Sequence, residues 1–302
     1  MRILLLGANG QVGHALRAAL QPLGEVVAAT RDGVAADGSA CLRADLADPA
    51  SLAQALAHAA PRLIVNAAAY TAVDRAEDEP QQAERINHQA LAELGAWAAA
   101  QRARVVHYST DYVFDGSAQR PYREEDATAP LGVYGRSKLA GEQALRASGA
   151  DHLILRTAWV YAPRGHNFLR TMLRLAHERD ELRVVADQVG APTPAHWIAQ
   201  ASAHVLARWR DHSHTLHVVA AGRASWHGFA SAIVARAHAR GLLARVPRVV
   251  PIASADYPTR ARRPAWSVLD CTRLRDRFGL ELPDWTVGLD EVLAELALHP
   301  QP

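Results

Sequence analysis

The chain has 302 residues, of which 49% are hydrophobic and 21% are charged, so it can form a large core and is not a disordered protein. Lys and Arg number 33 against 31 acidic residues, and a net charge of +2 gives no reason to expect nucleic acid binding. The two cysteines, Cys41 and Cys271, cannot form a disulfide framework. Such a composition favours a reducing compartment.

Two further features bear on localisation and metals. The opening sequence MRILLLG has only four apolar residues, whereas a signal peptide needs about 7 to 15 and a membrane span about 20. We therefore expect a cytoplasmic protein with no membrane segment. The only dense histidine group is His212, His214 and His217, which no cysteine or carboxylate set completes. We predict a solvated loop there, and no metal ligands.

The first half of the chain alternates short apolar runs with alanine-rich helical patterns. The pattern predicts strands at 2–6, 25–29, 41–46, 62–67, 104–109 and 152–157, and helices at 12–21, 50–58, 82–101 and 134–147. Asp48 followed by Pro49 is a typical helix start. Alternation at this spacing predicts a Rossmann-type, doubly wound parallel sheet with helices on both faces. Ligands of such sheets bind beyond the carboxyl ends of the strands.

The pattern becomes looser after residue 163. Helices are predicted at 167–179, 195–209 and 226–240, with strands at 183–185 and 216–220, and prolines are frequent from residue 192 onward. We predict that residues 1–163 form mainly a dinucleotide-binding domain. Residues 164–302 should form mainly a smaller, loop-rich α/β substrate domain, with some segments returning to the first sheet.

A glycine-rich turn, GANGQVG, follows the first predicted strand directly and precedes a helix. Gly7, Gly10 and Gly13 would allow a tight turn, a close approach of backbone amides to a diphosphate, and packing of the helix on the strand. This context predicts a dinucleotide site rather than an ordinary turn.

The ends of the next three strands suggest how that cofactor is bound. Arg31 follows the second strand and could pair with a 2′-phosphate, so NADPH is favoured; Asp32 keeps NADH open as the alternative. Asp45, with Leu46 beside it, could reach the adenine or could simply cap a helix. The small side chains of Ala67, Ala68 and Ala69 would let a cofactor lie against the backbone.

The predicted catalytic group follows the fifth strand. Thr110 and Asp111 come at its end, and Tyr134 and Lys138 lie four residues apart on one face of the next helix. A tyrosine has a pKa near 10, and a neighbouring ammonium would lower that pKa and suit it to proton transfer. Thr110 would hydrogen-bond the reacting oxygen. A Tyr-x-x-x-Lys pair often occurs by chance. In a chain that also has the glycine turn and a threonine at a strand end, we interpret the pair as catalytic.

These motifs together resemble the extended short-chain dehydrogenases/reductases and, within them, the dTDP-4-dehydrorhamnose reductase family. The resemblance covers nearly the whole chain, and the stretches PLGVYGRSKLAGE, ILRTAWVYAPRGHNFLRTMLRLA, DQVGAPT and YPTRARRPAWSVLD separate that family from general sugar-nucleotide epimerases. It implies that Gly10, Gln11 and Val12 contact the cofactor diphosphate and that the three alanines lie on its nicotinamide side.

The resemblance also implies a reaction, in which NADPH delivers hydride to C4 of dTDP-4-dehydro-6-deoxy-L-mannose. Tyr134 would protonate the alkoxide, with Lys138 and Thr110 in support. Thr110, Asp111 and Trp159 would contact the sugar, Trp159 as a wall beside the hexose, and Arg263 would meet the nucleotide diphosphate. The second domain would then bind the sugar nucleotide, and the product would serve cell-surface polysaccharide synthesis, including lipopolysaccharide O-antigen.

Two departures and two alternatives accompany this resemblance. Close relatives often have an acid near the end of the second strand, where this chain has Thr30-Arg31. Relatives that bind Mg²⁺ at a dimer contact have an acid where this chain has Ala15, so no Mg²⁺ ligands are assigned, while a homodimer stays compatible with the sequence. One alternative is a non-catalytic, NADP-binding regulatory subunit. The other is a sugar-nucleotide epimerase of the same fold; a dehydratase is disfavoured because Tyr112, not Glu, follows Thr110-Asp111.

Overall fold

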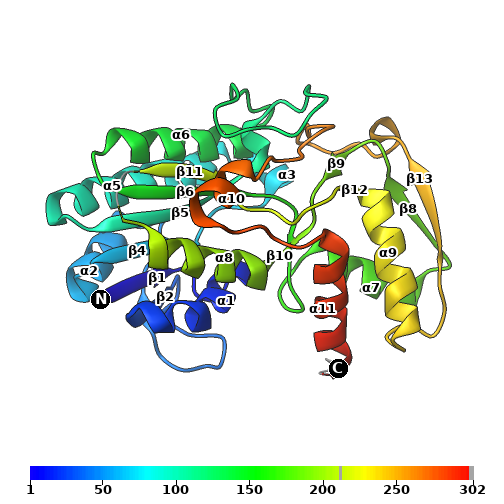
Figure 1. The fold of residues 1–302 in the computed structure, drawn as a ribbon, viewed down its shortest axis with the longest axis horizontal. Helices are drawn as coiled ribbons and strands as arrows, with labels where there is room; N and C mark the ends of the chain where they lie inside the picture. The colour runs from blue at the N-terminus through cyan, green and yellow to red at the C-terminus, as the bar shows by residue number, and fades with distance from the viewer. Residues whose placement is uncertain (211–212, 299–302) are drawn as a thin grey trace.

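A seven-stranded sheet forms the centre of the computed structural model, which describes residues 1–210 and 213–298 (Figure 1). All its neighbouring strands run parallel, in the order β11-β6-β5-β4-β1-β2-β3. The strands are β1 Arg2–Leu6, β2 Glu25–Thr30, β3 Leu42–Arg43, β4 Leu63–Asn66, β5 Arg104–Thr110, β6 His152–Thr157 and β11 His214–His217.

Helices cover both faces of this sheet (Figure 1). One face packs against α1 Gln11–Ala19, α8 Ala195–Arg208 and α10 Thr272–Phe278. The other packs against α2 Pro49–Ala59, α5 Ala90–Gln101 and α6 Val133–Ala147. Because both faces are apolar, the strands are continuous hydrophobic runs rather than alternating ones. The predicted doubly wound, Rossmann-type fold is confirmed.

A second hydrophobic core lies beside the sheet, on the right in Figure 1. It contains the buried residues Leu169, Phe229 and Leu289 from three helices. These helices are α7 Phe168–Glu178, α9 Trp226–Ala239 and α11 Trp285–Leu298, next to the parallel pair β8 Glu181–Val185 and β13 Arg248–Ile252. Two short pairs join the two parts: β7 Val160–Tyr161 with β10 Thr193–Pro194, and β9 Val189–Gly190 with β12 Ala224–Ser225.

Short helical segments complete the fold. The predicted helix 82–101 is interrupted by a π-helical turn, η2 Arg85–Gln89, between α4 Pro80–Glu84 and α5. The remaining segments are α3 Val73–Ala76 and the 3₁₀ turns η1 Gln21–Leu23, η3 Asp111–Val113 and η4 Ser254–Asp256. The predicted start of α2 is confirmed, since the Asp48 side chain accepts a hydrogen bond from Ala50 N and Pro49 is the first helical residue.

Two predicted strands and one predicted loop depart clearly from the structure. The third strand is limited to Leu42–Arg43, because the chain turns where Asp45 Oδ1 accepts a hydrogen bond from Ala47 N at 2.9 Å. The strand predicted at 216–220 begins and ends earlier, as β11. The predicted solvated histidine loop is wrong for His214 and His217, which belong to β11; His212 lies outside the described residues.

None of the helices within 1–210 and 213–298 combines the length and the apolar character that a bilayer crossing requires.

Candidate active site

A cleft of about 490 Å³ lies at the carboxyl ends of the central strands, where the topology predicts a ligand. It is lined by residues from the glycine turn, the ends of β2, β4, β5 and β6, and the face of α6. The predicted cofactor residues on its wall are Gly7, Gly10, Gln11, Val12, Arg31, Asp45, Leu46, Ala67, Ala68, Ala69, Tyr134 and Lys138. These residues, far apart in sequence, are therefore brought to one cavity.

The glycine turn leaves no room for side chains. Gly7 has φ +76°, and a Cβ there would lie 2.7 Å from Ala68 N. Gly13 is behind the turn and not on the cleft wall; its Cβ would lie 2.0 Å from Gly7 O. Gly10, the residue before α1, offers no side chain to the first amides of that helix. Those N–H groups, at the positive end of the helix, fit a diphosphate.

Where β2 ends at the cleft, the Asp32 carboxylate accepts hydrogen bonds within a local turn. Asp32 Oδ1 accepts hydrogen bonds from Thr30 Oγ1 at 3.0 Å and from Val34 N at 3.2 Å. The hydrogen bond from Val34 N is the main reason that the pKa of Asp32 is lowered. Arg31, which is exposed, lies on the cleft wall beside it.

The catalytic candidates Thr110 and Tyr134 lie close together, and Tyr134 is the one of the two that lines the cleft. The Thr110 hydroxyl donates to Asp111 Oδ1 at 3.0 Å and accepts from Tyr112 N at 3.2 Å. Burial raises the pKa of Tyr134, a hydrogen bond with Thr110 opposes that shift, and Asp111 and Tyr112 add to it. The phenol therefore stays protonated at neutral pH.

Lys138 does not act on Tyr134 as we expected from their spacing. Its Nζ hydrogen-bonds to Tyr108 O at 2.6 Å and to His107 Nε2 at 3.0 Å. Lys138 is also absent from the groups that shift the pKa of Tyr134, so the expected lowering by the ammonium is wrong for the protein alone. Burial lowers the pKa of Lys138 itself to about 7.

Asp111 is a buried carboxyl with an unused oxygen. It is 2% exposed, and its Oδ2 has no hydrogen-bond partner among the described residues. Burial raises its pKa to about 6, while the nearby Ser267 and Thr110 hydroxyls act in the opposite direction. Because a buried, unpaired polar atom is costly, Oδ2 is a strong candidate for contact with a ligand hydroxyl.

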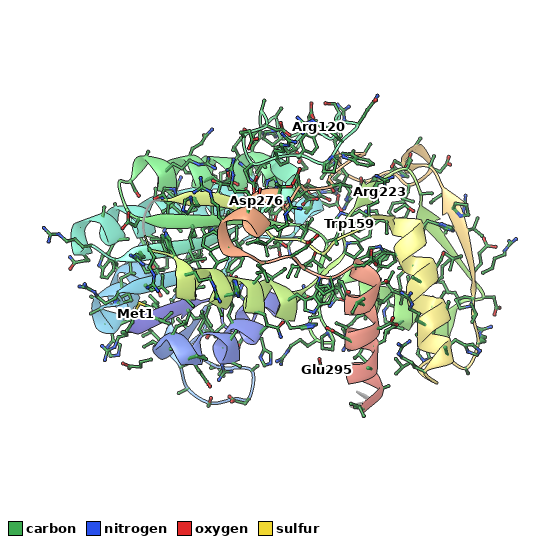
Figure 2. All side chains as sticks on the ribbon, in the orientation of Figure 1. Met1, Arg120, Trp159, Arg223, Asp276 and Glu295 are labelled. Carbon is green, nitrogen blue, oxygen red and sulfur yellow. The ribbon has the colours of Figure 1, made fainter. Side chains whose placement is uncertain are left out.

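Trp159 lies between the two parts of the molecule, as Figure 2 shows. Its ring stacks on Trp226 of α9 with a centroid distance of 3.4 Å and an interplanar angle of 1°. Its backbone has φ +48°, which is rare for a bulky residue and is often found at functional sites. Gly190 packs against the same ring, since a Cβ there would lie 2.5 Å from it.

Arg263 lies at the same junction but is already paired. Its Nη2 donates to Asp74 Oδ2 at 2.7 Å, and it also interacts with the Tyr112 hydroxyl, which contributes to a raised pKa of Arg263. Arg260 forms an ion pair with Asp78 nearby. The wall of the 490 Å³ cleft does not include the four residues predicted to contact the sugar nucleotide, which are Thr110, Asp111, Trp159 and Arg263.

Several cleft residues were not identified from the sequence. Asn9 lies between Gly7 and Gly10, Thr71 comes after β4, and Thr157 is the last residue of β6, so position alone could have suggested them. The Thr157 hydroxyl is buried without a partner among the described residues. Others carry no such signal: Ala44, Ile86, Tyr108 and Val160.

No group of three or more His, Cys, Asp or Glu with metal-binding geometry occurs within residues 1–210 and 213–298. Ala15 lines a separate cavity of about 380 Å³ with Gln11, His14 and Glu295.

Comparison with known proteins identifies the family. The model for the RmlD substrate binding domain matches residues 1–298. A dTDP-4-dehydrorhamnose reductase from Burkholderia thailandensis is 50% identical over 300 residues, covering 96% of this chain and 97% of that protein. Another, from Escherichia coli strain K12, is 44% identical and covers 98% of both.

Solved structures agree with these sequence relatives. A dTDP-4-dehydrorhamnose reductase from Bacillus anthracis in complex with NADP has a TM-score of 0.87 at 32% identity, covering 97% of this chain and 99% of that one. The sequence matches, the parallel sheet and the cleft at its carboxyl edge are consistent with one another. The chain belongs to the dTDP-4-dehydrorhamnose reductase family.

Proposed function

We propose that this chain reduces the C4 ketone of dTDP-4-dehydro-6-deoxy-L-mannose to dTDP-L-rhamnose with NADPH. The observation that carries the proposal is the single cleft that joins the glycine turn to Tyr134 and Lys138. Bound NADPH would supply the hydride. The role of the protein is to hold the reacting carbons in line and to protonate the oxygen.

Tyr134 is proposed as the proton donor. Burial raises its pKa, so its hydroxyl carries a proton at neutral pH that it can give to the developing alkoxide. Thr110, whose hydroxyl interacts with the phenol, would stabilise charge on the same oxygen. Asp111 Oδ2, buried without a partner among the described residues, would accept a hydrogen bond from a sugar hydroxyl.

The stacked pair of Trp159 and Trp226 is proposed as the wall beside the hexose. Its place at the junction of the two cores supports a partition in which residues 1–163 bind mainly the cofactor and residues 164–302 mainly the sugar nucleotide. Arg263 remains the proposed diphosphate contact. Its pairing with Asp74 means that an anion would compete with that carboxylate.

NADPH is proposed over NADH because the second strand ends next to an arginine. Arg31 and Asp32 both lie on the cleft wall, but Asp32 uses its Oδ1 in the turn to Val34. Comparing KM for the two cofactors tests this preference. The two cysteines are free, which suits the proposed cytoplasmic location.

The proposed reaction is tested by following NADPH absorbance with the sugar nucleotide generated in situ. We expect Tyr134→Phe to lower kcat by about 10²–10⁴-fold while NADPH still binds, because only the proton-donating hydroxyl group is removed. Tyr257→Phe, on an exposed tyrosine, is the matched control and should have wild-type activity. Full activity in Tyr134→Phe would show that another group is the donor.

The same assay separates the proposal from a regulatory role. A folded wild-type protein that binds NADPH but does not turn over this sugar nucleotide would contradict the reductase assignment.

A further inference from the structure

A buried hydroxyl group on the cleft wall is left without a use by the fold. Thr157 is the last residue of β6 and is 8% exposed. Its Oγ1 has no hydrogen-bond partner within residues 1–210 and 213–298, yet the residue lines the same 490 Å³ cleft as Tyr134. Because an unpaired buried polar atom is costly, we expect a polar group of a ligand to meet it.

The hydroxyl groups that β4 and β5 bring to this wall have other surroundings. The Tyr108 phenol donates to Ser202 Oγ at 2.7 Å. Ser109 Oγ also lacks a hydrogen-bond partner in the described part of the chain, but it lies near the Glu142 carboxylate of α6. Thr71, which comes after β4, is exposed to solvent. Thr157 differs from all three because its hydroxyl is both buried and away from any such group.

The order of the strands indicates which part of a dinucleotide would meet Thr157. The glycine turn follows β1, and β6 is three places from β1 on the side away from β2 and Arg31. Neighbouring strands are about 4.8 Å apart, which puts β6 about 14 Å from β1 along the sheet edge. With its adenosine at Arg31 and its diphosphate at the glycine turn, the cofactor would extend its nicotinamide toward β6. Thr157 is also paired in register with Thr110 of β5.

The nicotinamide ring has one polar substituent, a carboxamide, on the carbon next to C4. Its NH₂ group donates and its oxygen accepts, and a threonine hydroxyl can pair with either. The ribose hydroxyls lie between the ring and the diphosphate, so a group at the β6 end meets the carboxamide first. Val160 and the small alanines on the same wall suit the apolar remainder of the ring.

We propose that Thr157 is a cofactor-binding residue whose hydroxyl hydrogen-bonds the nicotinamide carboxamide and so fixes the orientation of the ring. This rests on the proposed use of NADPH. A ring held by apolar contacts alone can turn about its bond to the ribose, which would move C4 out of line with the sugar carbon. A hydrogen bond beside C4 opposes that rotation.

Binding in the absence of any sugar nucleotide tests the contact directly. Thr157→Val replaces the hydroxyl by a methyl group, and Thr157→Ser keeps it. The ligands are NADP⁺, its 3-acetylpyridine analogue, which lacks the amide NH₂, and its thionicotinamide analogue, in which a weakly accepting sulfur replaces the oxygen. Isothermal titration calorimetry gives the Kd of each ligand for each variant.

We expect Thr157→Val to raise the Kd of NADP⁺ about tenfold, and Thr157→Ser to raise it much less. One analogue should be insensitive to Thr157→Val: the acetyl analogue if the hydroxyl accepts from the NH₂ group, or the thio analogue if it donates to the oxygen. The same factor for all three ligands overturns the proposal. Thr71→Val is the matched control on this wall, and its small effect should be equal for the three ligands.

The stability of the cofactor-free protein separates binding from a structural role. Because Thr157 Oγ1 has no partner among the residues that the structure describes, Thr157→Val should unfold at the same urea concentration as wild type, or at a higher one. Saturating NADP⁺ should raise the urea midpoint less in this variant than in wild type. A cofactor-free variant that is less stable than wild type would show that the hydroxyl serves the fold, and would overturn the proposal.

Failure of the proposed function gives a different result. A folded wild-type protein that does not bind NADP⁺ contradicts the proposed cofactor, and the contact with Thr157 along with it. Wild-type binding of NADP⁺ with equal factors for the three ligands overturns the contact alone.

Discussion

Burial has different consequences for the two titratable side chains that α6 presents to the cleft. It raises the pKa of Tyr134 and keeps a proton on the phenol, and it lowers the pKa of Lys138 to about 7. One group is thus kept as an acid, and the other is near its titration point at working pH, where a proton is transferred most readily in either direction. In the proposed reaction, the environment of each side chain, rather than the Tyr-x-x-x-Lys spacing, would assign its role.

Gly190 provides a residue-scale test of the Trp159 wall. A Cβ at Gly190 would lie 2.5 Å from the Trp159 ring and 2.9 Å from Ser267 Oγ, so Gly190→Ala must displace the ring. We expect KM for the sugar nucleotide to rise about tenfold, within the range of overpacking costs, while the Kd of NADPH is unchanged. Gly228→Ala is the control, because its Cβ would meet only Ser225 Oγ, at 3.4 Å. An unchanged KM in Gly190→Ala would exclude the wall.

At the scale of elements, three acidic residues around α3 connect distant segments of the chain. Asp74 accepts from Arg263 and from Ala261 N, Asp78 pairs with Arg260, and Glu77 Oε1 accepts from Val133 N at 2.8 Å. The last contact satisfies one of the free amides at the start of α6, directly before Tyr134. The short helix α3 therefore helps to position α6, which carries the proposed proton donor.

Glu77→Ala should reveal that role. Loss of the acceptor at Val133 N is expected to cost about 1 kcal/mol in the free energy of unfolding and to lower kcat several-fold, since Tyr134 is in the same turn. Glu77→Gln keeps a carbonyl oxygen and should remain close to wild type. Urea unfolding and kcat are the two measurements; wild-type values of both in Glu77→Ala would contradict the role.

Local signals explain which elements could be predicted. Apolar runs marked the central strands, Asp48-Pro49 marked the start of α2, and the glycine turn marked the cleft, because each depends on residues close in sequence. The contacts Asp74 with Arg263 and Trp159 with Trp226 join residues far apart and leave no pattern in either segment. The sequence assigns His217 both to a predicted strand and to a predicted solvated loop, because only the return of β11 to the central sheet makes it a core residue.

At the scale of the whole molecule, buried ionisable groups make stability depend on pH. His217 is 0% exposed on β11, and burial lowers its pKa to about 3 from an ordinary value near 6.5. Its Nδ1 lies 3.1 Å from Asp270 O, so the neutral ring donates there. Above about pH 6.5 this histidine is neutral in both the folded and the unfolded chain. As the pH falls toward 3, it is protonated only in the unfolded chain. Folding therefore becomes less favourable in acid.

His217→Asn keeps the Nδ1-like donor but cannot be protonated. We expect the difference in unfolding free energy between about pH 7 and about pH 4.5 to be smaller in this variant by roughly 2 kcal/mol, whatever the cost of the substitution at neutral pH. His177→Asn is the matched control, since His177 also meets a backbone carbonyl but is exposed. Equal acid sensitivity of His217→Asn and wild type in urea unfolding would contradict this account.

The late position of β11 has a consequence for synthesis on the ribosome. β6 is buried along its whole length between β5 and β11, yet β11 is translated about 60 residues after it. At about 5–20 residues per second, a nascent chain holds β6 as an open apolar edge for several seconds. Such an edge is a template for pairing with other chains, so slow translation between β6 and β11 should increase aggregation of this protein.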